Sequence, residues 1–178
     1  MDPAGPDKTA GREISESLLL LLNMEIALNS RQRKGLEGAL QELDAMGFST
    51  GARLVAKLTE GRCPIAAEKE AVRFVCKDVW QAVFRKPATR LQTDRRGSYI
   101  IQDSAFRCLE QLAPPPNGGH DTELHEAAEL GLAFPCGMIR GALLGVGVDC
   151  AVSSDFSVSS LPACSFTVSL RQESRTKV

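Results

Sequence analysis

The feature that most constrains the fold is a regular alternation of apolar and polar residues in two segments near the end of the chain, 148–158 and 164–171. A period of two places the apolar row and the polar row on opposite faces of a β-strand. Such strands need a second layer that covers their apolar face. The two segments therefore predict an antiparallel sheet that is packed on one side and open to water on the other.

Two further strands and a helical layer are expected upstream and between them. Residues 89–93 and 98–103 flank a polar turn sequence, Asp94-Arg95-Arg96-Gly97, which is typical of a β-hairpin. Apolar residues recur at intervals of three and four in four segments, which predicts helices over about 14–31, 35–58, 64–85 and 122–144. The predicted fold class is α+β, with four helices packed on one face of a twisted, four-stranded antiparallel sheet.

Glycine and proline inside the predicted helices carry two further expectations. Gly47 and Gly51 lie four residues apart, and each costs up to ~1 kcal/mol relative to alanine, so we expect a close backbone approach to offset this cost. A kink at Gly47-Phe48 is the alternative. Pro135 removes a backbone hydrogen bond from the last helix, so that helix is expected to kink or restart there.

Length and composition define the broad class of the protein. The 178 residues suit a single domain over 13–172, with flexible tails over 1–12 and 173–178. With 21 basic and 22 acidic residues, the chain lacks the basic excess of a dedicated nucleic-acid binder. The longest purely apolar run, 18–22, is far shorter than the roughly 20 residues of a membrane span, and the N-terminus lacks the pattern of a secretory signal. We therefore expect an intracellular, soluble protein.

Residue types that carry catalysis or bind metal are present but not in the necessary spacing. The six cysteines contain no C-x-x-C pair and the only two histidines, His120 and His125, are five residues apart, so no metal site and no cofactor are predicted. Cys136 lies on an apolar helical stretch, which favours a core role over that of a nucleophile. The glycine-rich segment 141–148 follows a helix and precedes a strand, the reverse of a phosphate-binding loop. These patterns favour a binding or scaffolding module without catalytic residues.

Two surfaces carry candidate contacts. Leucines at 18–22 make the first helix apolar nearly all round, which indicates that one face meets the core and another meets a partner. A basic set lies around the predicted hairpin, and it suits either an anionic membrane or acidic partner, or the protection of an edge strand from aggregation. That basic set comprises Arg85, Lys86, Arg90, Arg95 and Arg96.

Five separated segments carry a resemblance to a known family. They read LDAMGFSTGARLVAKLTEG at 43–61, FVCKDVWQAVFRK at 74–86, RRGSYIIQD at 95–103, LAFPCGMIRGALLGVGV at 132–148 and SSLPACSF at 159–166. Together they resemble the small subunits of the transport protein particle (TRAPP), and within that family the branch of subunit six. The resemblance spans about 36–170, and the helix over 14–31 fits the first helix of the family.

The resemblance implies a non-catalytic scaffold of a vesicle-tethering complex that acts as exchange factor for a Rab-family GTPase in endoplasmic reticulum-to-Golgi transport. It implies a cytoplasmic protein that reaches these membranes peripherally, through the complex. Members of the family dimerise through the first two helices, and a subunit-three-like protein is the implied partner. The residues that would face this partner are Leu18, Leu19, Leu22, Ile26, Leu36, Leu40 and Leu43.

Two other interpretations involve a lipid. Gly61-Arg62-Cys63 resembles a motif of subunit three whose cysteine is acylated, but Pro64 follows here and the rest of the chain matches subunit six, so lipid attachment at Cys63 has little support. The alternative to a scaffold is a small-ligand or lipid-binding domain related to vinyl-reductase-like sensor domains. An apolar channel in such a domain would be lined by Val75, Val79, Ile139 and Leu143.

Overall fold

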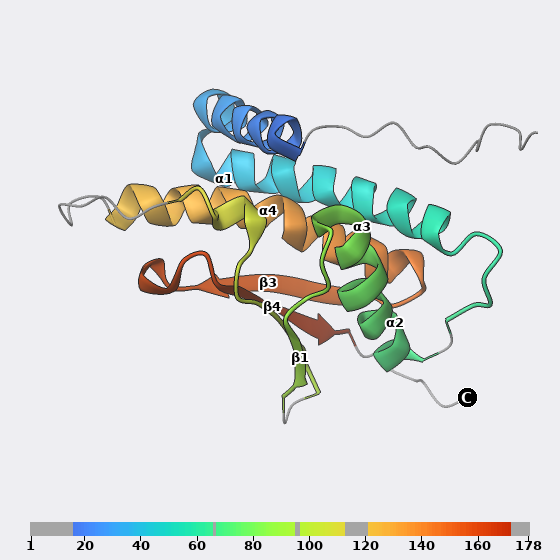
Figure 1. The fold of residues 1–178 in the computed structure, drawn as a ribbon. Coiled ribbons are helices and arrows are strands. Elements are labelled where there is room, and N and C mark those ends of the chain that lie inside the picture. Colours follow the sequence, from blue (N-terminus) through green and yellow to red (C-terminus); the bar gives the residue numbers. More distant parts are fainter. Residues whose placement is uncertain (1–15, 66, 95–96, 113–120, 172–178) are drawn as a thin grey trace, which may run out of the picture.

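The computed structural model of the chain describes residues 16–65, 67–94, 97–112 and 121–171 (Figure 1). Helix α1 (Glu16–Leu58) lies over helix α4 (Asp121–Gly145), and α4 lies over the sheet, so the molecule has three layers. A third helical segment, formed by α2 (Glu68–Phe74), the π-helical turn η1 (Val75–Val79) and α3 (Trp80–Phe84), packs beside α4. The tails predicted over 1–12 and 173–178 lie outside the described residues.

The sheet contains four antiparallel strands in the order β1-β2-β4-β3. Their bounds are Arg90–Thr93 for β1, Tyr99–Asp103 for β2, Cys150–Phe156 for β3 and Cys164–Leu170 for β4. Two short 3-10 turns, η2 (Arg107–Leu109) and η3 (Val158–Ser160), lie in the connections. The α+β class and the four-stranded antiparallel sheet are therefore confirmed.

The number of helices differs from the prediction, because the described residues form three continuous helical segments and not four. The first two predicted helices are one element, α1, which leaves the helical conformation at Gly35 (φ 72°, ψ 179°). Glycine adopts a positive φ without steric cost, so the chain bends there without an intervening loop. The Ser30 hydroxyl donates a hydrogen bond of 2.7 Å to Glu42 across the bend. Figure 1 shows the first half of α1 lying above its second half.

Helices α1 and α4 approach each other at glycine positions on both sides. A Cβ atom added to Gly47 would overlap the carbonyl oxygen of Phe134, and one added to Gly137 would overlap that of Asp44. Gly51 and Gly141 meet the opposite backbone in the same way. The close approach predicted for Gly47 and Gly51 is confirmed, and α1 does not break at Gly47.

Helix α4 continues without interruption from Asp121 through Pro135 to Gly145, so the predicted restart of this helix is wrong. Proline removes one backbone hydrogen bond, and the close packing of the neighbouring turns on α1 offsets that loss. This helix is also long and apolar enough to cross a membrane by length and composition. Because 67% of that apolar window is buried inside the molecule, α4 is explained as the central helix of the core.

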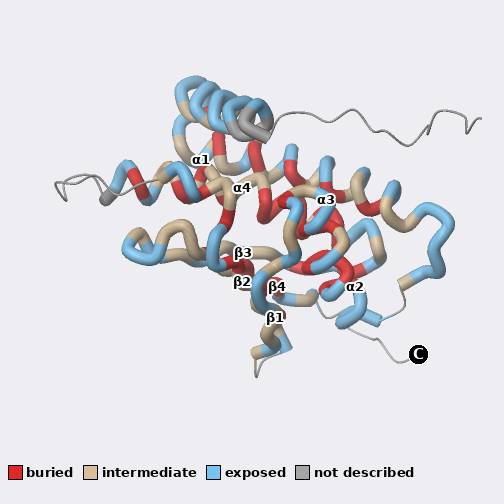
Figure 2. The backbone as a smooth tube through the Cα atoms, in the orientation of Figure 1, coloured by how far each residue is buried: buried red, intermediate tan, exposed pale blue. Residues whose placement is uncertain are grey.

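The main core lies between α4, the α2–α3 segment and the inner face of the sheet (Figure 2). Trp80 is fully buried at its centre and contacts Phe84, Phe106 and Phe166 at ring-centroid distances of 5.0–6.1 Å. Four of the nine aromatic residues of the chain therefore meet at one place, where each ring buries a large apolar area.

A buried carboxylate joins the hairpin to the helical layer. Asp103 is 1% exposed and accepts hydrogen bonds from Trp80 Nε1 (3.0 Å), Lys86 Nζ (2.7 Å) and the backbone amide of Ala105 (3.1 Å). Trp80, Lys86 and Asp103 belong to the segments 74–86 and 95–103 that carry the family resemblance. Their role here is structural, because a buried charge requires its partners to be in place.

Candidate partner-binding surface

Helix α1 exposes large apolar side chains to solvent, most of them on its first half. Leu18, Leu21, Leu22 and Leu28 are 53–60% exposed, and Met24 and Met46 are also exposed. We call these six residues the apolar α1 surface. Leu21, Met24 and Leu28 share one helix face at intervals of three and four, and Leu18 and Leu22 extend it around the helix. Monomeric soluble proteins rarely expose a large contiguous apolar patch, so this surface is typical of a contact site.

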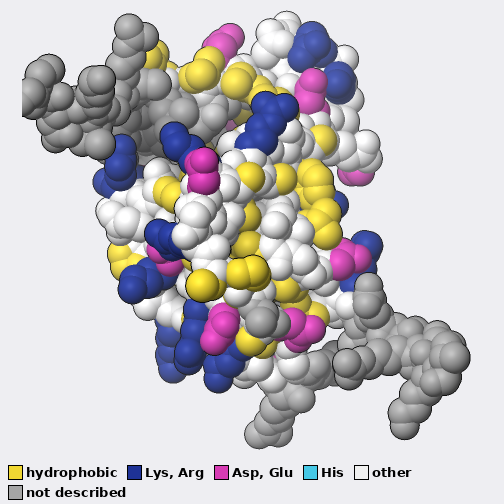
Figure 3. All heavy atoms as spheres, turned by 90° about the vertical axis from the view of Figure 1, so that its right-hand side faces the viewer, with side chains coloured by type: hydrophobic (Ala, Val, Ile, Leu, Met, Phe, Trp, Pro, Cys, Tyr) yellow, Lys and Arg dark blue, Asp and Glu magenta, His cyan; other side chains and the backbone are white. Residues whose placement is uncertain are grey.

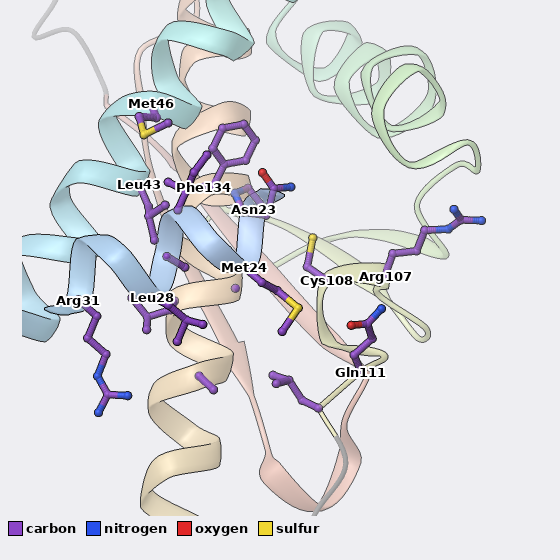
Figure 4. A pocket seen from close by; sticks show the side chains of 17 residues that line it. Asn23, Met24, Leu28, Arg31, Leu43, Met46, Arg107, Cys108, Gln111 and Phe134 are labelled. Atoms are coloured by element: carbon purple, nitrogen blue, oxygen red, sulfur yellow. The ribbon is translucent and has the colours of Figure 1, made fainter. Parts of the chain in front are cut away.

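A hollow of about 160 Å³ continues this surface toward the body of the molecule. Figure 4 shows Met24 and Leu28 on the first half of α1, Leu43 and Met46 on its second half, and Phe134 on α4. Arg107, Cys108 and Gln111, in and after η2, close the far side. Met24, Leu28 and Met46 belong both to the hollow and to the apolar α1 surface, so the two form one contact area.

Polar contacts hold the first half of α1 in place beside this hollow. Arg31 forms an ion pair with Glu126 of α4. The hydrogen bond from Ser30, followed by that from Lys34, lowers the pKa of Glu42 below its ordinary value, so the carboxylate stays ionised at the bend. Ile26 and Ala27 pack against a small second core formed by Ala39, Leu43 and Leu130. One side of the helix is thus fixed, and the opposite side is left to solvent.

The residues predicted to face a partner fall into three groups. Leu18 and Leu22 are exposed, whereas Ile26, Leu36 and Leu40 are half-buried against the second core. Leu43 is only 4% exposed and belongs to the interior, because the bend at Gly35 folds the first half of α1 over it. Leu43 also lines the hollow, so its contact with a partner stays a prediction. The side chain of Leu19 lies outside the described part of the structure.

Three residues of the apolar α1 surface are absent from the sequence prediction: Met24, Leu28 and Met46. Leu28 lies seven residues after Leu21, with Met24 between them, so the spacing of one helix face was visible in the sequence. Periodicity identifies such a face but does not say which of two faces the core will cover. Here Ile26 and Ala27 pack against the second core, and the helix face that carries Leu21 and Leu28 is exposed to solvent.

The cysteine thiols do not form a catalytic arrangement. Burial raises the pKa of Cys76 to about 12 and those of Cys108, Cys136 and Cys150 to about 11, and it raises the pKa of Cys164 further. Such thiols are protonated at neutral pH and are poor nucleophiles. His125 lies beside Glu129, with 3.4 Å between His125 Nε2 and Glu129 Oε1, and His120 lies outside the described residues. In the described ranges no group of His, Cys, Asp and Glu is arranged to hold a metal ion.

The four residues predicted to line a lipid channel lie in the packed core. Val75, Val79, Ile139 and Leu143 have no exposed area and belong to the packed core. A space of water size beside them would give them accessible area, so the channel predicted along these residues is wrong. Cys63 is exposed and lies at the edge of a separate surface hollow, together with Arg62, Ile65 and Phe74.

Comparison with known proteins places this geometry in a family. The family model described as "Transport protein particle (TRAPP) component" matches residues 18–172. Trafficking protein particle complex subunit 6B of Mus musculus is 35% identical over 162 residues, which cover 88% of this chain and 98% of that protein. Subunit 6A of Homo sapiens is 36% identical over 134 residues, covering 75% of this chain and 79% of that protein.

Solved structures support the same fold. Subunit 3 of the trafficking protein particle complex from Naegleria fowleri, covalently bound to palmitic acid, superposes with a TM-score of 0.63 at 16% identity, covering 89% of this chain and 98% of that one. An H-NOX protein from S. oneidensis superposes with a TM-score of 0.53 at 15% identity, covering 96% of this chain and 83% of that one. Both likenesses concern the fold alone. From the matched family model and the relatives of subunit 6, we conclude that the chain belongs to the TRAPP component family.

Proposed function

We propose that this chain is a non-catalytic scaffold subunit of a TRAPP-type vesicle-tethering complex, folded as one domain over 13–172. It binds a subunit-three-like partner through the apolar α1 surface. The assembled complex acts as exchange factor for a Rab-family GTPase in transport from the endoplasmic reticulum to the Golgi. The protein is cytoplasmic and reaches these membranes peripherally.

The observation that carries this proposal is the exposure of the apolar α1 surface together with its hollow. Burying one leucine or methionine side chain at an interface contributes roughly 1.5–3 kcal/mol. The leucines at 18, 21, 22 and 28 therefore supply enough apolar area for a stable contact, and the hollow beside Phe134 and Leu43 accommodates a protruding side chain of the partner. Arg31 and Arg107 at the rim offer polar contacts around this apolar centre.

A binding experiment with the subunit-three-like partner tests the proposal. We expect Leu22→Arg and Leu28→Arg each to weaken partner binding by about 10- to 100-fold, because each places a charge where an apolar side chain is buried. Leu144→Arg is the matched control, since Leu144 is also an exposed large apolar residue (48%) but lies on α4 outside the apolar α1 surface. Binding that is unchanged in both α1 variants, with all three variants folded, would refute the proposed interface.

A sensor-like lipid-binding role predicts a different result for the isolated chain. Native mass spectrometry would then show a retained small molecule. We expect an unmodified mass, because the hollow beside α1 is open and the core along Val75 and Ile139 is packed. A bound lipid that persists through purification would favour the alternative role.

A further inference from the structure

A second hollow, of about 520 Å³, lies between the α2–η1 segment and the β1–β2 hairpin. Lys69 and Arg73 of α2 and Lys77 of η1 follow one another at intervals of four, which places them on one side of the helical segment. Leu91, Thr93 and Tyr99 of the hairpin and Cys76 complete the lining. The hollow therefore combines three cations, two hydroxyl groups and an apolar floor, and no carboxylate of the described residues lines it.

The three basic side chains are free to bind a ligand. Most other described cations near the helices have a carboxylate partner: Arg62 lies 3.3 Å from Asp78, and Lys86 binds the buried Asp103. Lys69, Arg73 and Lys77 are exposed, and in the described part of the chain none has a carboxylate within ion-pairing distance. Of the two acidic residues of α2, Glu70 lines the separate hollow of Cys63, and Glu68 is not among the residues that line the basic hollow. The site thus carries a net charge of about +3.

The basic set predicted around the hairpin does not make this hollow. Lys86 donates a hydrogen bond to the buried Asp103. Arg90 precedes Leu91 on β1, so its side chain lies on the face opposite to those of Leu91 and Thr93. Arg95 and Arg96 lie outside the described residues. The positive charge of the hollow comes from Lys69 and Arg73 of α2 and Lys77 of η1. Figure 3 shows Lys and Arg side chains gathered low on one face of the molecule.

We propose that the hollow binds the phosphomonoester of an anionic phospholipid head group. Arg73 offers a planar fork that matches phosphate oxygens, and Lys69 and Lys77 add point charges on either side. The Thr93 hydroxyl is a further donor at the hairpin side. A doubly charged phosphate in this hollow would meet three cations without any opposing carboxylate.

A lipid is favoured over a phosphorylated peptide for two reasons. Lys69 and Lys77 lie about 12 Å apart along the helix, so the row also reaches lipids that neighbour the one bound in the hollow. Helix α2 and strand β1, which contribute residues to the hollow, lie low in Figure 1, whereas the first half of α1 lies at the top. Membrane contact here leaves the apolar α1 surface free for a partner, so the subunit touches the membrane directly and not only through the complex.

Vesicle binding by the full-length chain tests this inference. Vesicles of phosphatidylcholine with phosphatidylinositol monophosphate are compared with vesicles containing phosphatidylserine at matched total charge. We expect stronger binding to the first, competition by soluble inositol phosphate, and about a 30-fold loss in Arg73→Gln/Lys77→Gln, since each basic residue near an anionic leaflet strengthens binding about fivefold. Arg53→Gln/Lys57→Gln is the matched control: an exposed Arg and Lys, also four residues apart, on α1.

Each other outcome contradicts the inference. Equal binding to both lipids, or equal loss in both double variants, indicates unspecific attraction to charge. Binding of a phosphopeptide or of free phosphate without vesicle binding assigns the site to another ligand, and an absence of all binding removes the site. Partner binding measured on the same variants stays intact, because the two surfaces are separate, so the inference and the proposed interface fail independently.

Discussion

Asp103 is the residue on which the packing of the hairpin depends most. Its side chain is fully buried, and its carboxylate oxygens accept hydrogen bonds from Trp80, Lys86 and the Ala105 amide. Removal of one member of a buried ion pair leaves the other charge uncompensated, which typically costs about 3–5 kcal/mol. We expect Asp103→Ala to lower the free energy of unfolding, measured by urea denaturation, by about 3 kcal/mol.

The exposed ion pair between Asp149 and Arg171 provides the control for this substitution. Its closest N–O distance is 3.7 Å and both side chains are more than half exposed. Pairs of this kind contribute about 0–1 kcal/mol, so Asp149→Ala should change stability little. Equal losses in the two variants would contradict the role given to Asp103.

The cysteines differ in reactivity because they differ in burial. Since burial raises the pKa of five thiols to about 11 or higher, they remain protonated at pH 8, whereas Cys63 is exposed. Only the thiolate reacts with an alkylating reagent. We expect one thiol of the folded chain to be alkylated rapidly at pH 8, by intact-mass analysis, and all six after unfolding. Labelling of several thiols before unfolding would show that the core opens readily.

At the scale of elements, the contact between α1 and α4 depends on glycine. Because a Cβ at Gly137 would overlap the backbone of Asp44, Gly137→Ala must separate the helices, and overpacking of this kind costs about 1–3 kcal/mol. In Gly131→Ala of the same helix, the new methyl group meets its nearest atom at 3.4 Å. We expect this control to be neutral or to gain up to ~1 kcal/mol from helix propensity. Thermal unfolding should therefore shift downward for Gly137→Ala alone.

Local sequence rules predicted most elements but not how they continue into one another. The alternation around Val152 and Phe166 and the polar turn after Thr93 depend on neighbouring residues, so the strands were found at their correct places. The bend at Gly35 and the passage of α4 through Pro135 depend on the contact between α1 and α4, which joins residues nearly 90 positions apart, such as Gly47 and Phe134. Periodicity carries no information about such a contact, and two expected helices became one.

The same limit applies to the candidate site. The leucine run at 18–22 revealed an excess of apolar surface, and Leu18 and Leu22 do lie on it. Leu43 and Leu22 have equal hydrophobicity and both fit a helix face, yet one lies in the core and the other in solvent. What separates them is the position of each half of α1 relative to α4, which is a tertiary property. The basic hollow was likewise invisible, because it joins Lys69 and Arg73 to residues of a later hairpin.

On the scale of the whole molecule, the fold separates a helical side from a basic side. The first half of α1, which carries most of the apolar α1 surface, lies at the top of Figure 1, and α2 and β1, which contribute Arg73 and Leu91 to the basic hollow, lie low in it. Val75 and Ile139, in the packed core between them, have no exposed area. This arrangement suits a small subunit that contacts other components through its surface.

The most direct test of the partner contact is hydrogen–deuterium exchange on the full chain, alone and bound to a subunit-three-like partner. We expect the partner to slow exchange in the first half of α1, around Leu21 and Leu28, and in the segment of η2 beside the hollow. Exchange in α2 and β1, around Arg73 and Leu91, should stay unchanged. Protection confined to α2 and β1, with α1 unaffected, would contradict the claim that this chain is held in its complex through the apolar α1 surface.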